Sequence, residues 1–380
     1  MSNTRDEIVA LIQAAGKYEL HDENSEGMNA YAFIARHRPL DKAVFLKVYD
    51  ADTESAELFR EPRFLVEATT AGDQNRNLVE IYDAELLGDE YVLVAMEYVD
   101  GGSILRKLAL GPLGLMDALG SGVGILHGVA RLHAAGLVHR DIKPANVLLT
   151  RRGNLWVPKL GDFGSVARLS SPNGTVSASR HSALYVPPEG WAEPSCYGTR
   201  SDLYQVGMVL HEMVNGSLPY DPVAHLDREA LSEIKKAGAS GLKEMDCVEA
   251  CRVVERAIAR RASKQKLMEL GPQQPYEPKA LRKVIRRATA ASPEDRYQTA
   301  SEFIGALEAL SFPNWLSKPA DQITLATGWR GWDWQIEPDG KASSGGAWII
   351  RRSRAGAETF RRWAAAPSIR EAAEMVVEAS

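Results

Sequence analysis

The order of hydrophobic and polar positions divides the chain into a strand-rich first part and a helical second part. Ala30–Arg36 and Ala43–Tyr49 are rich in aromatic and aliphatic residues and flank a proline-containing turn, which predicts two paired strands. Leu78–Ala84 and Glu90–Tyr98 have the same strand character. Between these pairs, Thr53–Ala71 carries apolar residues at helical spacing, so we expect one helix within a small β-rich unit.

A break without large apolar residues at Asp100–Ser103 ends the strand-rich part. Beyond it, Leu115–Ala135 and Ser201–Asn215 are apolar with a helical period, whereas Asp227–Leu267 and Pro278–Leu310 are charged and amphipathic. The pattern therefore predicts a hinge that joins a β-rich lobe to a larger helical lobe.

From about Ser311 the composition changes, because five of the eight tryptophans fall in a short span: Trp315, Trp329, Trp332, Trp334 and Trp348. A Pro-Asp-Gly turn between Trp332–Ile336 and Ala347–Arg351 predicts a hairpin, and Ile369–Glu378 predicts a closing helix. We interpret the tryptophans as a small core or an intramolecular interface, with a ligand- or protein-binding patch as the alternative.

Composition narrows the class of protein. The 380 residues are 45% hydrophobic and 25% charged, with a formal net charge of −5, which argues against disorder and against nucleic acid as an obligatory partner. Three cysteines do not make a disulfide framework, and no uncharged apolar run reaches the roughly 20 residues of a membrane span. We therefore expect a cytoplasmic protein without a membrane partner.

The most informative segment is Val138–Leu149, in which a turn carrying Asp141 and Asn146 leads into a buried-looking strand. Asp162, followed by Phe163 and Gly164, comes sixteen residues after Asn146. An Asp and an Asn delivered to one place by a hairpin suit Mg²⁺, which prefers hard oxygen ligands and keeps phosphates and waters as the others. Asp141 is then free to orient an attacking hydroxyl.

In these motifs the sequence resembles the protein kinase family, over roughly residues 18–310. The resemblance implies that Asp141 is the catalytic base or hydroxyl-orienting group and that Lys143 neutralises charge on the transferring phosphoryl group. It also implies that Asn146 and Asp162 hold Mg²⁺.

The resemblance implies a fold class and a division of the chain. We expect an α+β, bilobal protein kinase fold with a small β-rich N-lobe (18–99), a large helical C-lobe (103–310) and a small C-terminal Trp-rich appendage (311–380). Residues 1–17 are expected to form a helical extension. Lys143 with Pro144 matches the serine/threonine version of the catalytic loop, so the expected acceptor is Ser or Thr.

Lys47 lies in the middle of the apolar strand Ala43–Tyr49, where a charge is costly unless it is paired. The resemblance implies that Lys47 binds the phosphates of ATP and pairs with a glutamate of the following helix. Glu61 is our first choice and Glu67 is the alternative, because Pro62 interrupts the helix near Glu61.

The nucleotide-covering loop departs from the family pattern. Counting back from Lys47 places Ala32 over the adenine, and of the usual three glycines only Gly27 remains. Glycines at such positions allow backbone N–H groups to approach phosphates closely, and Glu26 brings a negative charge there instead. Weak ATP affinity is therefore an expectation.

Residues 96–103 resemble the adenine-binding hinge of the family. Backbone groups of Glu97 and Val99 are expected to bind the base, with Met96 at the rear of the pocket and Ser103 at the ribose. Core packing is the alternative interpretation of Met96 and Val99.

The stretch 165–188 contains no acidic residue but several serines and threonines. Arg140 occupies the position that in this family receives an activation-loop phosphate, so we expect phosphorylation at Thr175, Ser177 or Ser179 to order the loop. Ser182 is expected to bond Asp141 and Lys143.

Three further residues resemble structural landmarks of the family. Glu189 is expected to form a buried ion pair with Arg296, and Asp202 to cap the backbone of the catalytic loop.

The expected function is ATP- and Mg²⁺-dependent phosphorylation of Ser or Thr in a protein substrate, by a soluble kinase of bacterial type. A nucleotide-binding pseudokinase scaffold and a kinase of non-protein substrates are the alternatives. We interpret the basic helical run between Arg252 and Arg287 as a solvated face, with docking of an acidic substrate or partner as the alternative. A soluble regulatory protein is expected to dock on the appendage or, under that alternative, on this run.

Overall fold

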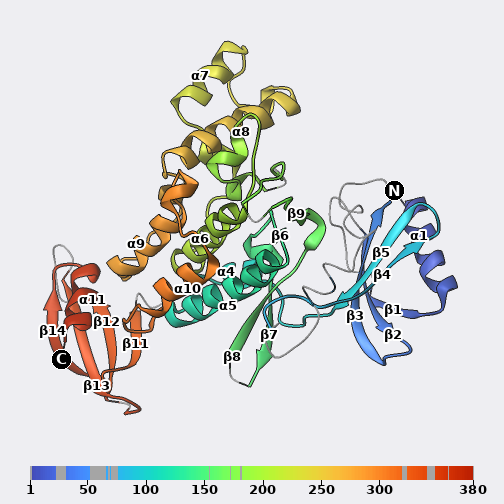
Figure 1. Cartoon of the computed structure of the whole chain (residues 1–380). Coiled ribbons are helices and arrows are strands. Elements are labelled where there is room, and N and C mark those ends of the chain that lie inside the picture. The colour runs from blue at the N-terminus through green and yellow to red at the C-terminus, as the bar shows by residue number, and fades with distance from the viewer. Residues whose placement is uncertain are drawn as a thin grey trace.

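The computed structural model describes residues 2–22, 31–51, 66, 69, 76–153, 155–171, 173–179, 182–318, 323–339, 347–357 and 359–379. They form a β-rich N-lobe, a helical C-lobe and a C-terminal sheet, arranged with the C-lobe in the middle (Figure 1). This is the α+β bilobal fold that the sequence predicts, with a β-rich C-terminal appendage.

The N-lobe sheet has five antiparallel strands in the order β1-β2-β3-β5-β4. Successive side chains of each strand point to opposite sides of the sheet, so the strands contribute to two separate buried faces. The strands are β1 (Tyr18–Asp22), β2 (Tyr31–His37), β3 (Lys42–Asp50), β4 (Ile81–Leu87) and β5 (Tyr91–Glu97).

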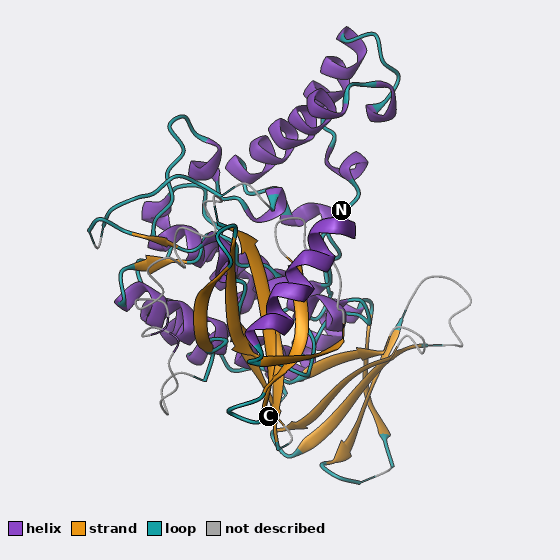
Figure 2. Cartoon of the chain, turned by 90° about the vertical axis from the view of Figure 1, so that its right-hand side faces the viewer, coloured by secondary structure: helices purple, strands orange, loops and turns teal. Residues whose placement is uncertain are grey.

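Helix α1 (Ser2–Ala15) covers the outer face of this sheet, as Figure 2 shows. Ile8 and Ile12, one turn apart, are fully buried against Phe33, Val44 and Leu46 of the strands. The opposite face carries Tyr49, Val94 and Met96 and belongs to a second core that continues into the C-lobe. The sheet is therefore a layer between two hydrophobic cores.

The C-lobe is built on α5 and α6, which are apolar enough to be surrounded by other elements. Two short two-stranded sheets, β6 with β9 and β7 with β8, lie on the side facing the N-lobe (Figure 1). The elements are α4 (Ile104–Leu108), α5 (Leu115–Ala134), β6 (Leu137–Val138), β7 (Val147–Arg152), β8 (Leu155–Leu160), β9 (Ala167–Arg168), α6 (Thr199–Asn215), α9 (Lys279–Ala288) and α10 (Ala300–Glu308).

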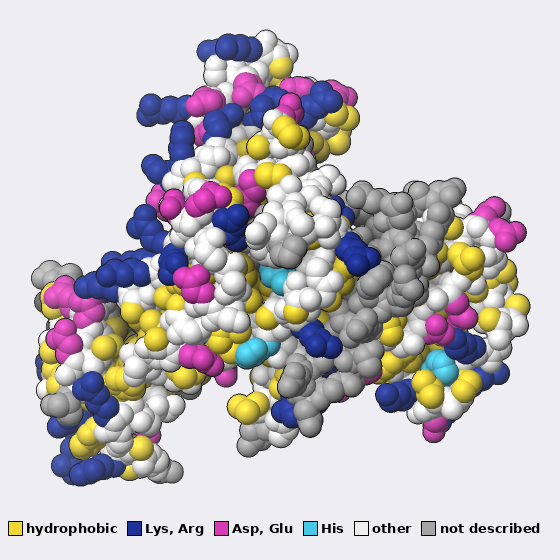
Figure 3. All heavy atoms as spheres, viewed as in Figure 1, with side chains coloured by type: hydrophobic (Ala, Val, Ile, Leu, Met, Phe, Trp, Pro, Cys, Tyr) yellow, Lys and Arg dark blue, Asp and Glu magenta, His cyan; other side chains and the backbone are white. Residues whose placement is uncertain are grey.

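Helices α7 (Arg228–Lys236) and α8 (Cys247–Ser263) project from the C-lobe around a small core of their own. Much of the predicted basic run is neutralised here: Arg256 lies 2.6 Å from a Glu233 oxygen, and Arg260 lies 2.7 Å from an Asp227 oxygen. Figure 3 shows basic and acidic side chains interleaved over this projection. These pairs favour the solvated-face interpretation of the run.

The appendage is a five-stranded antiparallel sheet in chain order, closed by α11. The predicted hairpin is confirmed as β12 with β13 and the closing helix as α11, whereas β10, β11 and β14 were not predicted. The elements are β10 (Trp315–Lys318), β11 (Ile323–Trp329), β12 (Trp332–Pro338), β13 (Trp348–Arg354), β14 (Arg361–Ala366) and α11 (Ile369–Glu378).

The tryptophans of the appendage confirm the core interpretation in part. Trp315 and Trp334 are 0% and 1% exposed and belong to the same hydrophobic core as Phe303 and Leu307 of α10. Arg352 lies over Trp332, with its guanidinium carbon 4.3 Å from the ring centroid. The appendage therefore shares the C-lobe core rather than having a separate one.

Candidate active site

The segment that follows β6 gathers three predicted site residues around one carboxylate. Asp141 is 6% exposed, and its Oδ2 accepts hydrogen bonds from Lys143 Nζ at 2.8 Å and Asn146 Nδ2 at 3.1 Å. Asn146 Nδ2 also donates to the backbone oxygen of Asp141 at 2.8 Å. These contacts hold the Asp141 carboxylate in one orientation.

Lys143 connects this loop to the activation segment. Its Nζ lies 2.7 Å from Ser182 Oγ while it also contacts Asp141, which confirms the expected bond between Ser182 and Lys143. The expected bond between Ser182 and Asp141 is not present among the described residues; Lys143 bridges the two instead. A hydroxyl acceptor brought beside Ser182 would therefore meet both a carboxylate and an ammonium group.

Asp202 of α6 fixes the backbone of the catalytic loop, as the sequence predicts. Its two carboxylate oxygens accept from the backbone N–H groups of His139 and Arg140, both at 2.9 Å, and His133 Nε2 lies 2.8 Å away. Asp202 is fully buried, so each of these bonds satisfies a polar group that water does not reach. Gln205 Oε1 accepts a further hydrogen bond from the backbone N–H of Ile142 at 2.8 Å.

Lys47 and Asp162 come together from different lobes. Lys47 Nζ lies 2.6 Å from Asp162 Oδ1, although the two residues are 115 positions apart. Burial alone would raise the pKa of the Asp162 carboxyl, but the charge and hydrogen bond of Lys47 outweigh it and hold that pKa below its usual range. Asp162 is therefore ready to act as an anionic oxygen ligand.

The register of β7 and β8 explains why Asn146 and Asp162 are neighbours. Val147 pairs with Leu160, and the N–H of Gly161 donates to the backbone oxygen of Asn146 at 2.9 Å. The residue before β7 and the residues after β8 therefore lie at the same end of the hairpin. Two oxygen donors at one end of a hairpin, one of them anionic, fit the ligand preference of Mg²⁺.

The adenine-side residues share the inner face of the N-lobe sheet. Ala32 pairs directly with Lys47, and Met96 pairs with Phe45. Met96 is 5% exposed and belongs to the core beneath the sheet, and Val99 packs against the same core. Ala32 therefore lies beside Lys47, and its place over the adenine stays a prediction.

The hinge is anchored by an ion pair that the sequence analysis missed. Lys159 of β8 lies 2.8 Å from a Glu97 oxygen, and its Nζ also donates to the backbone oxygen of Leu78 at 3.3 Å. The Glu97 side chain is thereby used within the protein, and its backbone N–H donates to the backbone oxygen of Glu80 at 2.8 Å. The sequence feature that could have indicated this ion pair is the lysine in the otherwise apolar strand β8, because a charge in such a strand requires a partner.

Two hinge residues have local structural tasks. Ser103 Oγ accepts the backbone N–H of Arg106 at 3.4 Å and so caps α4. A Cβ at Gly101 would lie 2.0 Å from the backbone oxygen of Leu149, so only glycine fits there.

Three predicted residues, Gly27, Glu61 and Glu67, lie outside the described residues. The glutamate partner expected for Lys47 and the loop expected over the nucleotide stay predictions.

Arg140 links the catalytic loop to the activation segment. It has a positive φ of 67°, and its guanidinium donates to the backbone oxygens of Ser165 and Ser177, the second at 2.9 Å. Arg140 is 6% exposed, so these bonds hold a buried cation against the segment that carries the candidate phosphorylation sites.

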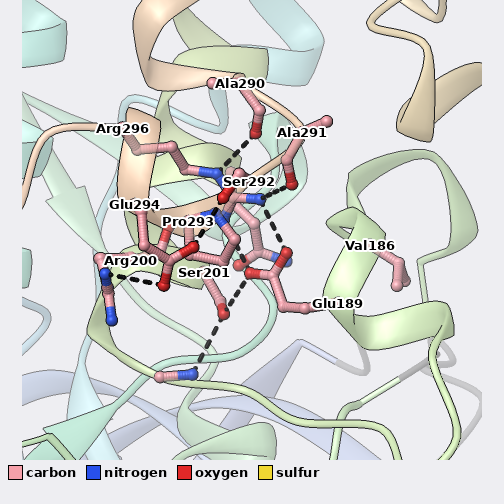
Figure 4. A network of polar contacts seen from close by, with 12 residues as sticks. Val186, Glu189, Arg200, Ser201, Ala290, Ala291, Ser292, Pro293, Glu294 and Arg296 are labelled. Atoms are coloured by element: carbon pink, nitrogen blue, oxygen red, sulfur yellow. Dashed lines mark hydrogen bonds and ion pairs between the residues drawn. The ribbon is translucent and has the colours of Figure 1, made fainter.

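Glu189 and Arg296 form the buried ion pair that the sequence predicts (Figure 4). Two parallel N–H···O bonds of 2.7 Å join them, and the Arg296 side chain is 0% exposed. Arg296 also donates to the backbone oxygens of Ala290, Ala291 and Arg200. This network fixes the segment after the activation loop to the base of the C-lobe.

A cavity of 400 Å³ adjoins the catalytic loop. The activation segment and the projecting helix α8 both contribute to its walls, and its lining is mainly apolar. The residues that line it include Lys143, Ser182, Leu184, Tyr185, Val254 and Ile258. An acceptor placed at Lys143 and Ser182 would therefore have an apolar recess beside it.

Comparison with known proteins agrees with this geometry. The family model described as "Protein kinase domain" matches residues 18–305. A "Probable serine/threonine-protein kinase" of Clostridium perfringens is 30% identical over 298 residues, which cover 77% of this chain and 38% of that protein. Serine/threonine-protein kinase PrkC of Bacillus subtilis is 31% identical over 291 residues (76% and 39%), and PknL of Mycobacterium tuberculosis is 34% identical over 227 residues (58% and 54%).

The chain spans about two fifths of the length of the first two of these curated relatives. Among the described residues, no helix combines the length and the apolar character needed to cross a bilayer.

Proposed function

Because the chain belongs to the protein kinase domain family, we propose that it transfers the γ-phosphoryl group of ATP to Ser or Thr of a protein substrate. The observation that carries the proposal is the contact set of Asp141, Lys143, Asn146 and Ser182, together with Asp162 held by Lys47. The names of the relatives, all serine/threonine kinases, support the acceptor type.

The side chains act by position and charge. Asp141, oriented by Lys143 and Asn146, accepts the proton of the acceptor hydroxyl, and Lys143 lies where it offsets negative charge on the transferring group. Lys47 contacts the phosphates, and the backbone of Glu97 and Val99 binds the adenine next to Met96 and Ala32.

Asn146 Oδ1 and the Asp162 carboxylate would hold Mg²⁺. When bound, Mg²⁺ neutralises charge on the phosphates and fixes their geometry. The chain's own contribution is to keep Asp162 anionic through Lys47 and to keep Asn146 oriented through its bonds to Asp141.

Regulation by phosphorylation is a second part of the proposal. Arg140 already contacts the backbone of Ser177, so a phosphate on Thr175, Ser177 or Ser179 would arrive close to a buried guanidinium. Replacing all three with Ala should lower the specific activity of protein that has been allowed to autophosphorylate. Unchanged activity and unchanged phosphate content would contradict it.

A regulatory protein that docks on the appendage, and a cytoplasmic location, stay predictions from the sequence.

The test of the activity is transfer of labelled phosphate from ATP with Mg²⁺ to a generic protein substrate. Asp141→Asn should lower the rate about 100- to 10,000-fold, because the group that accepts the hydroxyl proton is lost. Nucleotide binding should persist. Asp89→Asn, an exposed site in the β4–β5 turn, is the matched control and should be fully active. Equal rates in both variants, or no transfer by the unaltered protein, would refute the proposal.

A further inference from the structure

The appendage sheet gathers arginines at one end of β13 and β14. The register places Arg352 opposite Arg361, and Arg354 lies two residues further along β13, so the three side chains share one face of the sheet. Arg354 and Arg361 are exposed, and Arg352 is half-buried. Figure 3 shows Lys and Arg side chains gathered at the lower end of the appendage. We call these three residues the arginine patch; it lies outside residues 18–305, which match the kinase family model.

Tryptophan rings support the centre of the patch. The guanidinium carbon of Arg352 lies 4.3 Å from the ring centroid of Trp332. The rings of Trp334 and Trp363 are also near it, at 5.8 and 5.7 Å, and Arg354 lies 4.8 Å from the centroid of Trp332. A cation–π contact uses the face of a guanidinium and leaves the N–H groups in its plane available. The rings therefore hold two arginines without using their hydrogen-bond donors.

No acid neutralises the patch within the part of the chain that the structure describes. There, no carboxylate forms an ion pair with any of the three arginines, and no acceptor takes a hydrogen bond from their side chains. The acids of β12 lie at alternate positions, on the other face of the sheet. Glu337 pairs there with Arg351 at 2.5 Å. Asp333 accepts the backbone N–H groups of Gly328 and Gly356.

The register also sets like charges directly opposite each other. Arg352 faces Arg361 across β13 and β14, and on the other side of the sheet Arg351 faces Arg362. Like charges at directly opposed positions destabilise a sheet. Glu337 offsets this repulsion at Arg351, whereas the patch has no such acid among the described residues. An anion bound across Arg352 and Arg361 would relieve the repulsion.

We propose that the arginine patch is a docking site for a protein segment phosphorylated on Ser or Thr. A phosphate monoester carries about two negative charges at neutral pH, and arginine binds such a group through two parallel N–H···O bonds. The patch spans roughly 7 Å along β13 and 5 Å across to β14. This area fits one phosphate group, whereas single-stranded nucleic acid is bound along a groove that follows several nucleotides.

The choice of phosphoserine or phosphothreonine rests on the proposed function, because these are the products of a serine/threonine kinase. The argument from charge does not rest on it. The two can fail separately, since binding of a synthetic phosphopeptide requires no phosphoryl transfer by this chain.

Fluorescence anisotropy with the full chain tests the assignment. The probes are labelled peptides of the sequence Gly-Ala-X-Ala-Gly, in which X is phosphothreonine, threonine or glutamate, and a labelled thymidine decamer. The phosphothreonine peptide should bind saturably, the glutamate peptide should bind more weakly, and the threonine peptide should not bind.

Variants locate the binding on the patch. Arg352→Gln and Arg361→Gln should each weaken the phosphothreonine peptide about tenfold, as expected for the loss of a charge-assisted contact. Arg352→Lys keeps the charge but loses the planar fork, so it should weaken binding as well. Arg351→Gln removes the same charge from the adjacent residue on the other face, and as the matched control it should bind as the unaltered protein does.

Stability gives a second readout that a purely structural role would not produce. Arg361→Gln should raise the midpoint of thermal unfolding of the free chain while it weakens peptide binding, because it removes one of two opposed charges. A lower midpoint would contradict the argument from opposed charges.

Several results would overturn the proposal. Absence of saturable binding by the phosphothreonine peptide, or equal affinity in Arg352→Gln, would remove the site. A glutamate peptide that binds as tightly would remove the assignment of phosphate. A thymidine decamer that binds more tightly than the phosphopeptide, and loses this binding in Arg352→Gln, would replace the protein partner by nucleic acid.

Discussion

Replacing Glu189 by Gln tests how much the buried ion pair with Arg296 contributes to the C-lobe. Gln keeps the size of the side chain and one carbonyl oxygen but removes the counter-charge of a guanidinium that is 0% exposed. Removing one partner of a buried pair typically costs about 3–5 kcal/mol, because the remaining charge stays buried. We expect a loss of that order in the free energy of unfolding.

The same network contains a matched control. Arg200 and Glu294 form a surface pair of 3.4 Å with side chains 35% and 70% exposed (Figure 4). Exposed pairs contribute about 0–1 kcal/mol, so Glu294→Gln should change stability little.

Denaturant unfolding followed by circular dichroism measures both variants. Hydrogen exchange adds the location, because Glu189→Gln should accelerate exchange first in residues 185–191 and 290–296. Losses of equal size in Glu189→Gln and Glu294→Gln, or a loss below about 1 kcal/mol for Glu189→Gln, would refute the reasoning from burial.

Three further predictions follow from other contacts. Burial raises the pKa of Glu212 from 4.5 to about 7, so between these pH values the folded state holds a proton that the unfolded state has lost. The contribution of Glu212 to the free energy of unfolding is therefore fully present below pH 4.5 and falls by about 3 kcal/mol as the pH rises to 7. Glu212→Gln should remove this dependence in unfolding curves measured from pH 4.5 to 8, and an unchanged slope would contradict it. Gly101→Ala should destabilise by about 1–3 kcal/mol, because its Cβ would overlap a backbone oxygen, whereas Gly120→Ala on the open side of α5 should not. Lys159→Met should raise the KM for ATP about tenfold by releasing the hinge at Glu97, with a smaller effect on kcat; an unchanged KM would show that the pair does not position the hinge.

The cluster of Asp141, Lys143 and Asn146 was predictable because its signal is local. Asp141, Lys143 and Asn146 lie within six residues, and their offsets alone bring the three side chains to one turn. Asp162 needed one more step, the pairing of β7 with β8. Where one strand pair separates two residues, sequence spacing is a good guide to distance.

Contacts between residues far apart in the sequence could not be predicted in this way. The Lys159–Glu97 pair joins residues 62 positions apart, and the strand pattern gives no sign of which acid faces the lysine. Likewise, the acids that neutralise Arg256 and Arg260 of the basic run could not be identified from the sequence, because Glu233 lies on α7 and Asp227 is the N-cap of α7. Charge balance on a surface depends on packing between helices, which a sequence does not display.

The appendage was the least predictable part. Along β10 the burial of side chains does not follow from the sequence pattern. Trp315 is fully buried in the core that the appendage shares with the C-lobe, whereas the adjacent Leu316 is 45% exposed. Periodicity reports burial within one element, and here the burial comes from another lobe.

The shared core around Trp315 has a consequence for how the chain can be divided. Residues 314–315 contact the start of α5, where Asn314 Oδ1 accepts the backbone N–H of Met116, and Trp315 belongs to the C-lobe core. A cut after Leu310 would remove this buried tryptophan and expose apolar side chains of that core. A shortened kinase lobe would expose an apolar surface prone to aggregation, and the detached sheet would lose the C-lobe core against which it packs. Although the two parts differ in architecture, neither can be transplanted without the other.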